Sequence, residues 1–327
     1  MSTAVRDPLA AQTGKQPPRI LRGLPWLVWR QHRTAFAAVL LLTAAGCVNM
    51  LWQRHATLGW LDRARADSAV DLLDAFGQRY GGPFQDATWM MSLVPVVAGV
   101  FLGAPLIAGD RERRTAQLVT TQSVTRGRWL AVKLGTAVLI TVVCSAALSA
   151  VFTSWWEPAH DLVNSGDWLS DDVFFHTGPV PVAVALLHLA VGVALGLLAG
   201  RTLLAMGLTL GFAVAWDLIL SSCVPLGSAK PRVLDNPVEQ GQPTLPEGAA
   251  RHDNWTVDAH GGLHGFGECF NVRNPAECRA KGIVAERLEY FGYDQMPGMQ
   301  WTYAALVLAA ALAILALTLW WGRRRPL

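Results

Sequence analysis

Six apolar runs divide the chain. They cover residues 34–52, 88–109, 130–153, 180–200, 202–224 and 301–321, and each is close to the roughly 20 residues that a helix needs to cross a bilayer. The chain is 52% apolar and only 16% charged, a balance that is unusual for soluble domains. We therefore predict an all-α polytopic membrane protein with six transmembrane helices.

Charged side chains are distributed unequally between the segments that flank these runs. With six spans the two termini share a side, and the segments on that side carry 15 of the 27 Lys and Arg but 3 of the 24 Asp and Glu. The opposite segments carry 11 basic and 20 acidic residues. Basic loops stay inside, so we expect cytoplasmic N and C termini. The basic groups then serve topology and contact with anionic lipid, and no nucleic-acid partner is expected.

The segments divide further by composition. Residues 1–18 are rich in Ala, Gln, Thr and Pro and are expected to form a disordered cytoplasmic tail. Residues 19–33 mix apolar and basic side chains, which favours an interfacial helix, with an ordinary solvated tail as the alternative. Residues 34–224 hold the first five spans. Residues 301–327 hold the last span and a basic cytoplasmic tail.

Two shorter outer segments carry their own signals. Leucines and Phe76 within residues 53–87 indicate an amphipathic helix on the outer surface, closed by Gly81-Gly82-Pro83. Trp155 and Trp156 open the next outer segment, 154–179, and suit an aromatic pair at the outer headgroups.

The third outer segment, residues 225–300, is one long extracellular loop. Its Pro, Gly and Asn content predicts irregular structure up to about residue 275. Residues 276–291 are compatible with one helix before the last span.

The segment between the second and third spans, residues 110–129, is polar and strongly basic. It is short and lies between two apolar runs, which indicates a cytoplasmic loop, and its few apolar side chains suit a helix at the interface. Such a helix can dock a partner. Its five arginines are Arg111, Arg113, Arg114, Arg126 and Arg128.

A longer pattern runs through this segment. It consists of an acidic cluster, Thr115, Leu118, Thr120-Thr121-Gln122-Ser123-Val124-Thr125-Arg126, Arg128-Trp129-Leu130 and Lys133, with Trp29-Arg30-Gln31-His32-Arg33 before the first span. Together with the six runs, this pattern resembles ABC-2-type transporter permeases, in particular their actinobacterial members. Arg114 departs from the family, which usually places Gly before the threonine, so the local turn can differ.

The resemblance implies a function. It implies the membrane subunit of an ATP-driven exporter in the bacterial cytoplasmic membrane, working as a homodimer or related heterodimer with separate ABC ATP-binding subunits. ATP and Mg²⁺ belong to that partner, and no cofactor is expected in this chain. The translocation path is expected at the dimer interface, near the second and fifth spans. The residues implied in coupling to the ATPase are Arg111, Glu112, Arg113, Thr115, Gln122, Ser123, Val124, Arg126 and Arg128.

Catalytic motifs are missing from the sequence. The chain has no glycine-rich phosphate loop followed by Lys and Ser or Thr, no His-Glu-x-x-His helix and no Gly-x-Ser-x-Gly turn. We therefore expect that the chain is not an enzyme. The competing function is a membrane-anchored sensor or accessory protein, in which the long outer loop binds a ligand or a partner and no solute crosses.

The cysteines fall into two groups. Three lie in apolar spans, where a thiol behaves as a small hydrophobe. Cys269 and Cys278 share the outer loop, in an oxidising compartment, and we predict a disulfide between them. The competing interpretation is a metal site formed by His252, His260, His264 and Cys269, but the neighbouring glycines disfavour the helix it needs, so no metal is expected.

Polar and small residues within the spans are informative. His188 and Asp217 lie in the fourth and fifth spans at similar distances from the turn at Arg201, and polar groups inside a membrane are costly. They are expected either to line a translocation path or to form a structural hydrogen bond. Gly192, Gly196 and Gly200 recur every four residues, which favours close helix packing. Pro95, Gly99, Gly103 and Pro105 are expected to weaken the second span.

Overall fold

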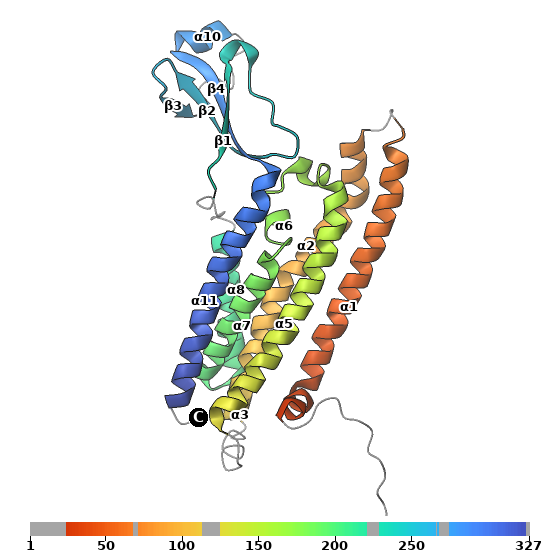
Figure 1. Cartoon of the computed structure of the whole chain (residues 1–327), viewed down its shortest axis with the longest axis vertical. Coiled ribbons are helices and arrows are strands. Elements are labelled where there is room, and N and C mark those ends of the chain that lie inside the picture. Colours follow the sequence, from red (N-terminus) through yellow and green to blue (C-terminus); the bar gives the residue numbers. More distant parts are fainter. Residues whose placement is uncertain are drawn as a thin grey trace, which may run out of the picture.

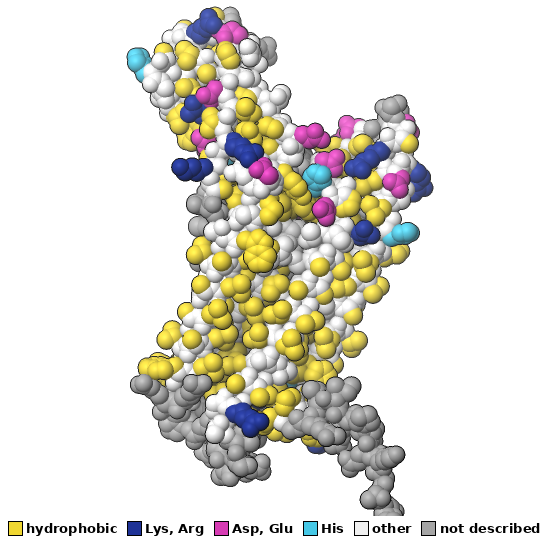
Figure 2. All heavy atoms as spheres, viewed as in Figure 1, with side chains coloured by type: hydrophobic (Ala, Val, Ile, Leu, Met, Phe, Trp, Pro, Cys, Tyr) yellow, Lys and Arg dark blue, Asp and Glu magenta, His cyan; other side chains and the backbone are white. Residues whose placement is uncertain are grey.

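The computed structural model describes residues 24–67, 71–112, 125–220, 229–265, 267 and 275–324. A bundle of long helices carries a small β-sheet domain at one end (Figure 1). Hydrophobic side chains cover the middle of the visible face, and charged ones gather toward its ends (Figure 2). The helices of the bundle are α1 (Leu24–Ala64), α2 (Leu72–Val97), α3 (Ala104–Glu112), α5 (Arg126–Trp156), α7 (Val180–Ala199), α8 (Thr202–Leu220) and α11 (Met296–Arg324).

Five helical segments in the described part of the chain are long and apolar enough to cross a membrane. They contain α1, the stretch from α2 to α3, α5, α7 and α11. The helix α8 is apolar but shorter, and the end of its predicted run, residues 221–224, lies outside the described residues. The chain is therefore a multi-pass helical membrane protein, and the sixth span and the orientation stay predictions.

The first helix is longer than the sequence indicated. Residues 24–33, which we expected in a separate interfacial helix, form the first turns of α1, and the helix runs unbroken to Ala64. Pro25 lies in the first turn, where its missing N–H leaves no hydrogen bond unmade, so nothing separates the two parts. At 1.5 Å per residue the 41 residues extend about 60 Å, well beyond a bilayer core.

The amphipathic helix predicted on the outer surface within residues 53–87 is not a separate helix, because its residues belong to the long helices α1 and α2. The helix α2 begins at Leu72, capped by the Asp71 carboxylate, which accepts from the N–H groups of Leu73 and Asp74. It continues through Pro83 to Val97. Buried aromatic rings on this half, among them Phe76, pack against α1 and α5 and stabilise one continuous helix across the glycines.

The helix α7 lies at the centre of the bundle. It contacts α2, α3, α5, α8 and α11. In its most apolar stretch 61% of the residues are buried, against 17–50% in the corresponding stretches of the other spans. Between α2 and α3 the chain forms a π-helix, η1 (Ala98–Gly103), that packs on α7. A Cβ at Gly99 would lie 2.8 Å from the carbonyl oxygen of His188, and one at Gly103 would lie 2.7 Å from that of Leu189. Only glycine permits this approach.

The same contact explains the glycines of α7. Cβ atoms at Gly192 and Gly196 would collide with the backbone of Gly99 and Ala104, so these two positions serve close packing as predicted. Gly200 has another role: with φ of 63° it ends α7 in the left-handed conformation and starts the turn to α8.

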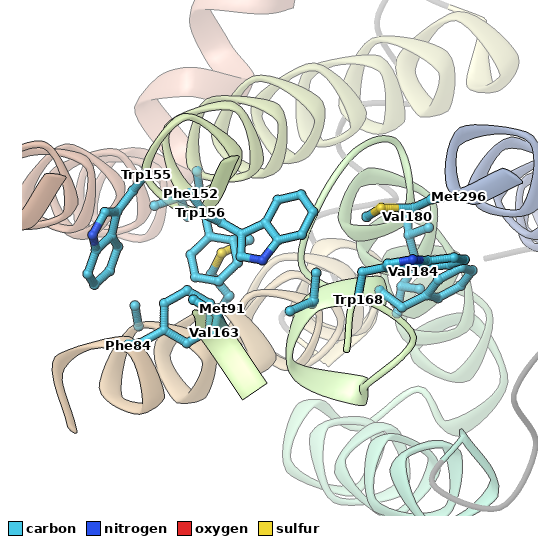
Figure 3. Packing of buried hydrophobic residues seen from close by; sticks show 14 of the residues in the cluster. Phe84, Met91, Phe152, Trp155, Trp156, Val163, Trp168, Val180, Val184 and Met296 are labelled. Atoms are coloured by element: carbon cyan, nitrogen blue, oxygen red, sulfur yellow. The ribbon is translucent and has the colours of Figure 1, made fainter. Parts of the chain in front are cut away.

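The half of the bundle next to the β-sheet, which we expect to be the outer half, has an aromatic core. Figure 3 shows side chains from α2, α5, α7 and the 157–179 segment packed together. Trp155 and Trp156 are 2% and 3% exposed and belong to this core, so the prediction that they form an aromatic pair at the outer headgroups is wrong. The Trp155 indole N–H donates to Thr57 of α1 at 2.9 Å, a partner that a buried indole needs.

The third outer segment folds as a sheet, contrary to the irregular loop and the helix predicted there. Strands β1 (Arg232–Pro237), β2 (Ala250–Asp258), β3 (Leu263–Gly265) and β4 (Ile283–Phe291) pair antiparallel in the order β1-β4-β2-β3. The predicted helix 276–291 is reduced to α10 (Pro275–Ala280), and the rest is β4. Phe291 joins the bundle core, so the sheet rests on the helices. The β4 strand leads into α11 through a short 3-10 turn.

Candidate coupling site and outer cavity

A buried ion pair and its hydrogen bonds join three helices at the end of the bundle opposite the β-sheet (Figure 1). The Nζ atom of Lys133 on α5 contacts the carboxylate of Asp110 on α3, and their side chains are 0% and 4% exposed. Nζ also donates to the carbonyl oxygen of Leu106 at 3.0 Å and lies 4.7 Å from the ring centre of Trp129. Gln31 of α1 donates to the second carboxylate oxygen. Each charge is compensated, as burial demands.

The sequence analysis did not assign this pair. Asp110 and Lys133 belong to the pattern that carries the family resemblance, yet neither was expected to form a site. The sequence nevertheless contains a signal for this pair. One acidic and one basic residue lie at the margins of two neighbouring apolar runs, where an unpaired charge is costly.

The end of α3 is attached to the turn between α7 and α8. The guanidinium of Arg111 donates to the carbonyl oxygen of Leu197, in the last turn of α7. The Oε2 atom of Glu112 accepts from the N–H of Thr202, the first residue of α8, at 3.2 Å. Both contacts satisfy backbone groups that a helix end leaves without an intrahelical partner. Arg111 and Glu112, implied in contacts with an ATPase, therefore also hold the chain's own turn in place.

The rest of the predicted coupling set is described only in part. Arg113, Thr115, Gln122, Ser123 and Val124 lie outside the described residues, as does the side chain of Arg126. Arg128 is exposed in the first turn of α5. The roles of all these residues in binding an ATPase stay predictions.

The two intramembrane polar residues line one cavity without forming a pair. A cavity of about 480 Å³ lies between α2, α7, α8 and the short helix α6 (Asp171–Phe174), and we call it the outer cavity. Both His188 and Asp217 line it. The Nδ1 atom of His188 lies 2.9 Å from the carbonyl oxygen of Val184, and its ring packs on Phe212 of α8. No hydrogen bond or ion pair joins His188 to Asp217, although the structure describes both side chains.

Asp217 belongs to a group of acidic side chains at the outer side of this cavity. Burial and the negative charges of Asp172 and Asp217 raise the pKa of Asp171. His176 lies beside them, with Nδ1 3.1 Å from the carbonyl oxygen of Asp172 and Nε2 2.9 Å from the Ser92 hydroxyl of α2. Burial lowers the pKa of His176, although the neighbouring carboxylates oppose this. Asp217 was predicted as a site residue from the sequence, whereas Asp171, Asp172 and His176 were not, because α6 was not predicted.

The outer domain contains the remaining predicted residues. Cys278 is buried in α10 and Cys269 lies outside the described residues, so the pairing stays a prediction. His264 lies 2.8 Å from the Asp258 carboxylate, which also accepts from the N–H groups of His260 and Gly262 in the β2–β3 turn. These contacts lower the pKa of Asp258 to about 2. Within the described residues no three His, Cys, Asp or Glu side chains form a possible metal site.

Comparison with known proteins supports the family resemblance. The model of the family described as "ABC-2 membrane transporter related" matches residues 33–224, more than half of the 327-residue chain. This range starts near the beginning of the first predicted span, ends with the fifth, and includes the ion pair, the turn at Gly200 and the outer cavity. Curated proteins and solved structures give no match. The chain belongs to the ABC-2 membrane transporter related family.

Proposed function

We propose that the protein is the membrane subunit of an ATP-driven exporter in the bacterial cytoplasmic membrane, coupled to separately encoded ATP-binding subunits. The observation that supports this most directly is the attachment of Arg111 and Glu112 to the turn between α7 and α8. These two residues belong to the segment 110–129, which the resemblance assigns to contact with the ATPase. A partner that moves this segment acts through two direct bonds on the fourth and fifth spans.

The buried ion pair extends this connection to other helices. Asp110 precedes Arg111 and is held by Lys133 of α5 and Gln31 of α1. Motion of the α3 end is thus transmitted to α1 and α5 as well as to α7 and α8. Because α7 and α8 line the outer cavity, nucleotide-driven motion on one side of the membrane can change the cavity on the other.

We further propose that two permease copies meet along α2 and α8. Large apolar side chains of both helices are half exposed beside the outer cavity, among them Leu93 of α2 and Val214 and Leu218 of α8. A second copy packed there would complete the wall of a path between subunits, as the family resemblance implies. ATP and Mg²⁺ bind to the partner subunit in this proposal, since the present chain has no phosphate-binding glycine loop.

Co-purification tests the proposal. The tagged chain is isolated from its native membrane, and proteins bound to it are identified. We expect an ATP-binding subunit to co-purify with the wild type and to be reduced at least about ten-fold in Arg126→Ala/Arg128→Ala, because interfacial charge pairs contribute about 1–3 kcal/mol each. Arg63→Ala/Arg65→Ala, two exposed arginines at the β-domain end, is the matched control. Absence of any ATP-binding subunit would contradict the proposal.

One observation favours a second candidate function. The segment after α8 folds into a four-stranded domain that rests on the bundle, and a sensor or accessory protein could use such a domain to bind a ligand. The same purification separates the two candidates. If the protein is a sensor, either a partner of the outer domain or no partner co-purifies with it. The Arg126→Ala/Arg128→Ala change would then not alter the set of co-purified proteins.

A further inference from the structure

The outer cavity has walls of two kinds. Most of its lining is apolar and comes from α2, α7 and α8, with Pro95, Val184 and Val214 among the lining residues. Two indole rings, Trp89 of α2 and Trp216 of α8, stand at its sides. A cavity of about 480 Å³ is large enough to hold an organic molecule, and aromatic walls are typical of sites that hold one.

The polar part of the lining is acidic. Asp171, Asp172 and Asp217 all line the cavity, and its described lining contains no Lys or Arg. Burial first, and then the negative charges of Asp172 and Asp217, raise the pKa of Asp171, and the described lining holds no Lys or Arg that would oppose this rise. A bound cation would relieve this repulsion, and indole faces attract cations in addition.

Two polar atoms in the lining have no partner in the described chain. The Nε1 atom of Trp216 is buried and makes no hydrogen bond. His188 is 2% exposed, and its hydrogen bond within the described residues uses Nδ1 alone, so Nε2 remains available. Buried polar atoms are almost always satisfied, and a donor and an acceptor on the same cavity are groups that a polar ligand can use.

We propose that this cavity binds an amphipathic organic cation, with its apolar body between Trp89 and Trp216 and its charge at Asp171, Asp172 and Asp217. The proposal rests on the proposed transporter function and names the chemical class of the transported molecule.

The test compares two ions of one shape and opposite charge. Tetraphenylphosphonium and tetraphenylborate are bound to the purified full chain in lipid nanodiscs, and binding to empty nanodiscs is subtracted. We expect saturable binding of the cation and none of the anion. Asp171→Asn/Asp217→Asn is expected to raise the Kd of the cation about ten-fold or more. Asp86→Asn removes an exposed carboxylate of α2 that does not line the cavity and is expected to leave the Kd unchanged.

The outcomes decide between the proposals. Equal saturable binding of both ions, or a Kd unaffected by the double variant, overturns the cation site. If the double variant does not elute as folded protein, Asp217→Asn alone changes an exposed side chain and is expected to raise the Kd about three-fold. Because binding is measured without ATP or partner, its failure leaves the co-purification result intact, and loss of the ATP-binding subunit leaves the cation site intact.

Discussion

The ammonium group of Lys133 lies against the carboxylate of Asp110, and both side chains are almost completely buried. The pair connects α5 to the last residues of α3, at the start of residues 110–129, the segment that the family resemblance assigns to contact with an ATPase. Breaking a buried pair leaves an uncompensated charge, whereas replacing both members by apolar groups need not. Comparing a single replacement with a double replacement of the pair therefore separates its contribution to stability from its contribution to coupling.

Lys133→Met is expected to lower the stability of the bundle by about 3–5 kcal/mol, because the carboxylate of Asp110 stays buried without its cation. Asp110→Leu combined with Lys133→Met is expected to recover most of this loss. Thermal unfolding of detergent-purified protein measures both. Lys230→Met, at an exposed position outside the bundle, serves as control. Equal melting temperatures for Lys133→Met and Lys230→Met would rule out the structural role of the pair.

Gly103→Ala is expected to destabilise the protein by about 1–3 kcal/mol, because the added methyl group collides with the backbone of α7. Gly135 of α5 has open space around it, so Gly135→Ala is expected to leave the stability unchanged or raise it by about 1 kcal/mol. The melting temperatures of both variants, measured in the same detergent, show whether the two stability changes have opposite signs. Two changes of the same sign and size would show that η1 and α7 do not pack as closely as described.

Cys269 and Cys278 are expected to form a disulfide, and its reduction is expected to loosen the outer domain without unfolding the spans. Mass spectrometry of the non-reduced peptides detects the bond. Hydrogen exchange before and after reduction is expected to rise in residues 229–291 and to stay unchanged in α5 and α7. Two free thiols in freshly isolated protein would exclude the bond.

Binding of the cation is expected to weaken as the pH falls from 7 to about 4.5. The raised pKa of Asp171 means that this carboxyl takes up a proton at a higher pH than an ordinary Asp at about 3.9. The lowered pKa of His176 means that its ring is neutral at pH 7 and gains charge only below about 6.5. Both protonations make the lining less negative. A Kd that is constant over this range would contradict the electrostatic part of the site.

Orientation is tested by labelling single cysteines in intact cells with an impermeant reagent. Ser123→Cys is expected to stay unlabelled and Ser228→Cys to react, because the charge bias places residues 110–129 inside and residues 225–300 outside. Each variant is labelled again after permeabilisation to show that the thiol is reactive. Labelling of Ser123→Cys in intact cells would overturn the orientation.

The long apolar runs and the glycine pattern were readable from the sequence because both are local signals. A run of about 20 apolar residues predicts a span wherever it occurs. Their spacing predicted that Gly192 and Gly196 let another helix approach closely, and in the structure the backbone of the second apolar run does so. The turn at Gly200 and Arg201 was also expected, since a basic residue interrupts two apolar runs there.

The outer domain was missed because its signals are non-local. Residues 283–291 contain Ala, Glu, Arg and Leu, which favour helices, yet they form β4 between β1 and β2. Arg287 pairs with Asp235 of β1, 52 positions earlier, at 2.7 Å. A strand's preference depends on such neighbours, and one sequence does not reveal them.

The candidate site was predictable only in part for the same reason. His188 and Asp217 stood out as polar residues inside apolar runs, and both line the outer cavity. Asp171 and His176 come from a segment without periodicity, and only the fold brings them to α2 and α8. Glu112 was expected to face a partner, while its bond to Thr202 depends on where the turn between α7 and α8 lies.

The most direct test follows the outer cavity while ATP is turned over. Val214→Cys, in a background where Cys47, Cys144 and Cys223 are alanine, places a thiol on the exposed part of α8 that lines the cavity. Its rate of labelling is measured in the complex with the ATP-binding subunit, with and without ATP. The account predicts a rate that changes several-fold with ATP, and loss of this change in Arg111→Ala/Glu112→Ala with the ATP-binding subunit still bound. A rate that does not respond to ATP, or responds equally in the double variant, would contradict coupling through the turn between α7 and α8.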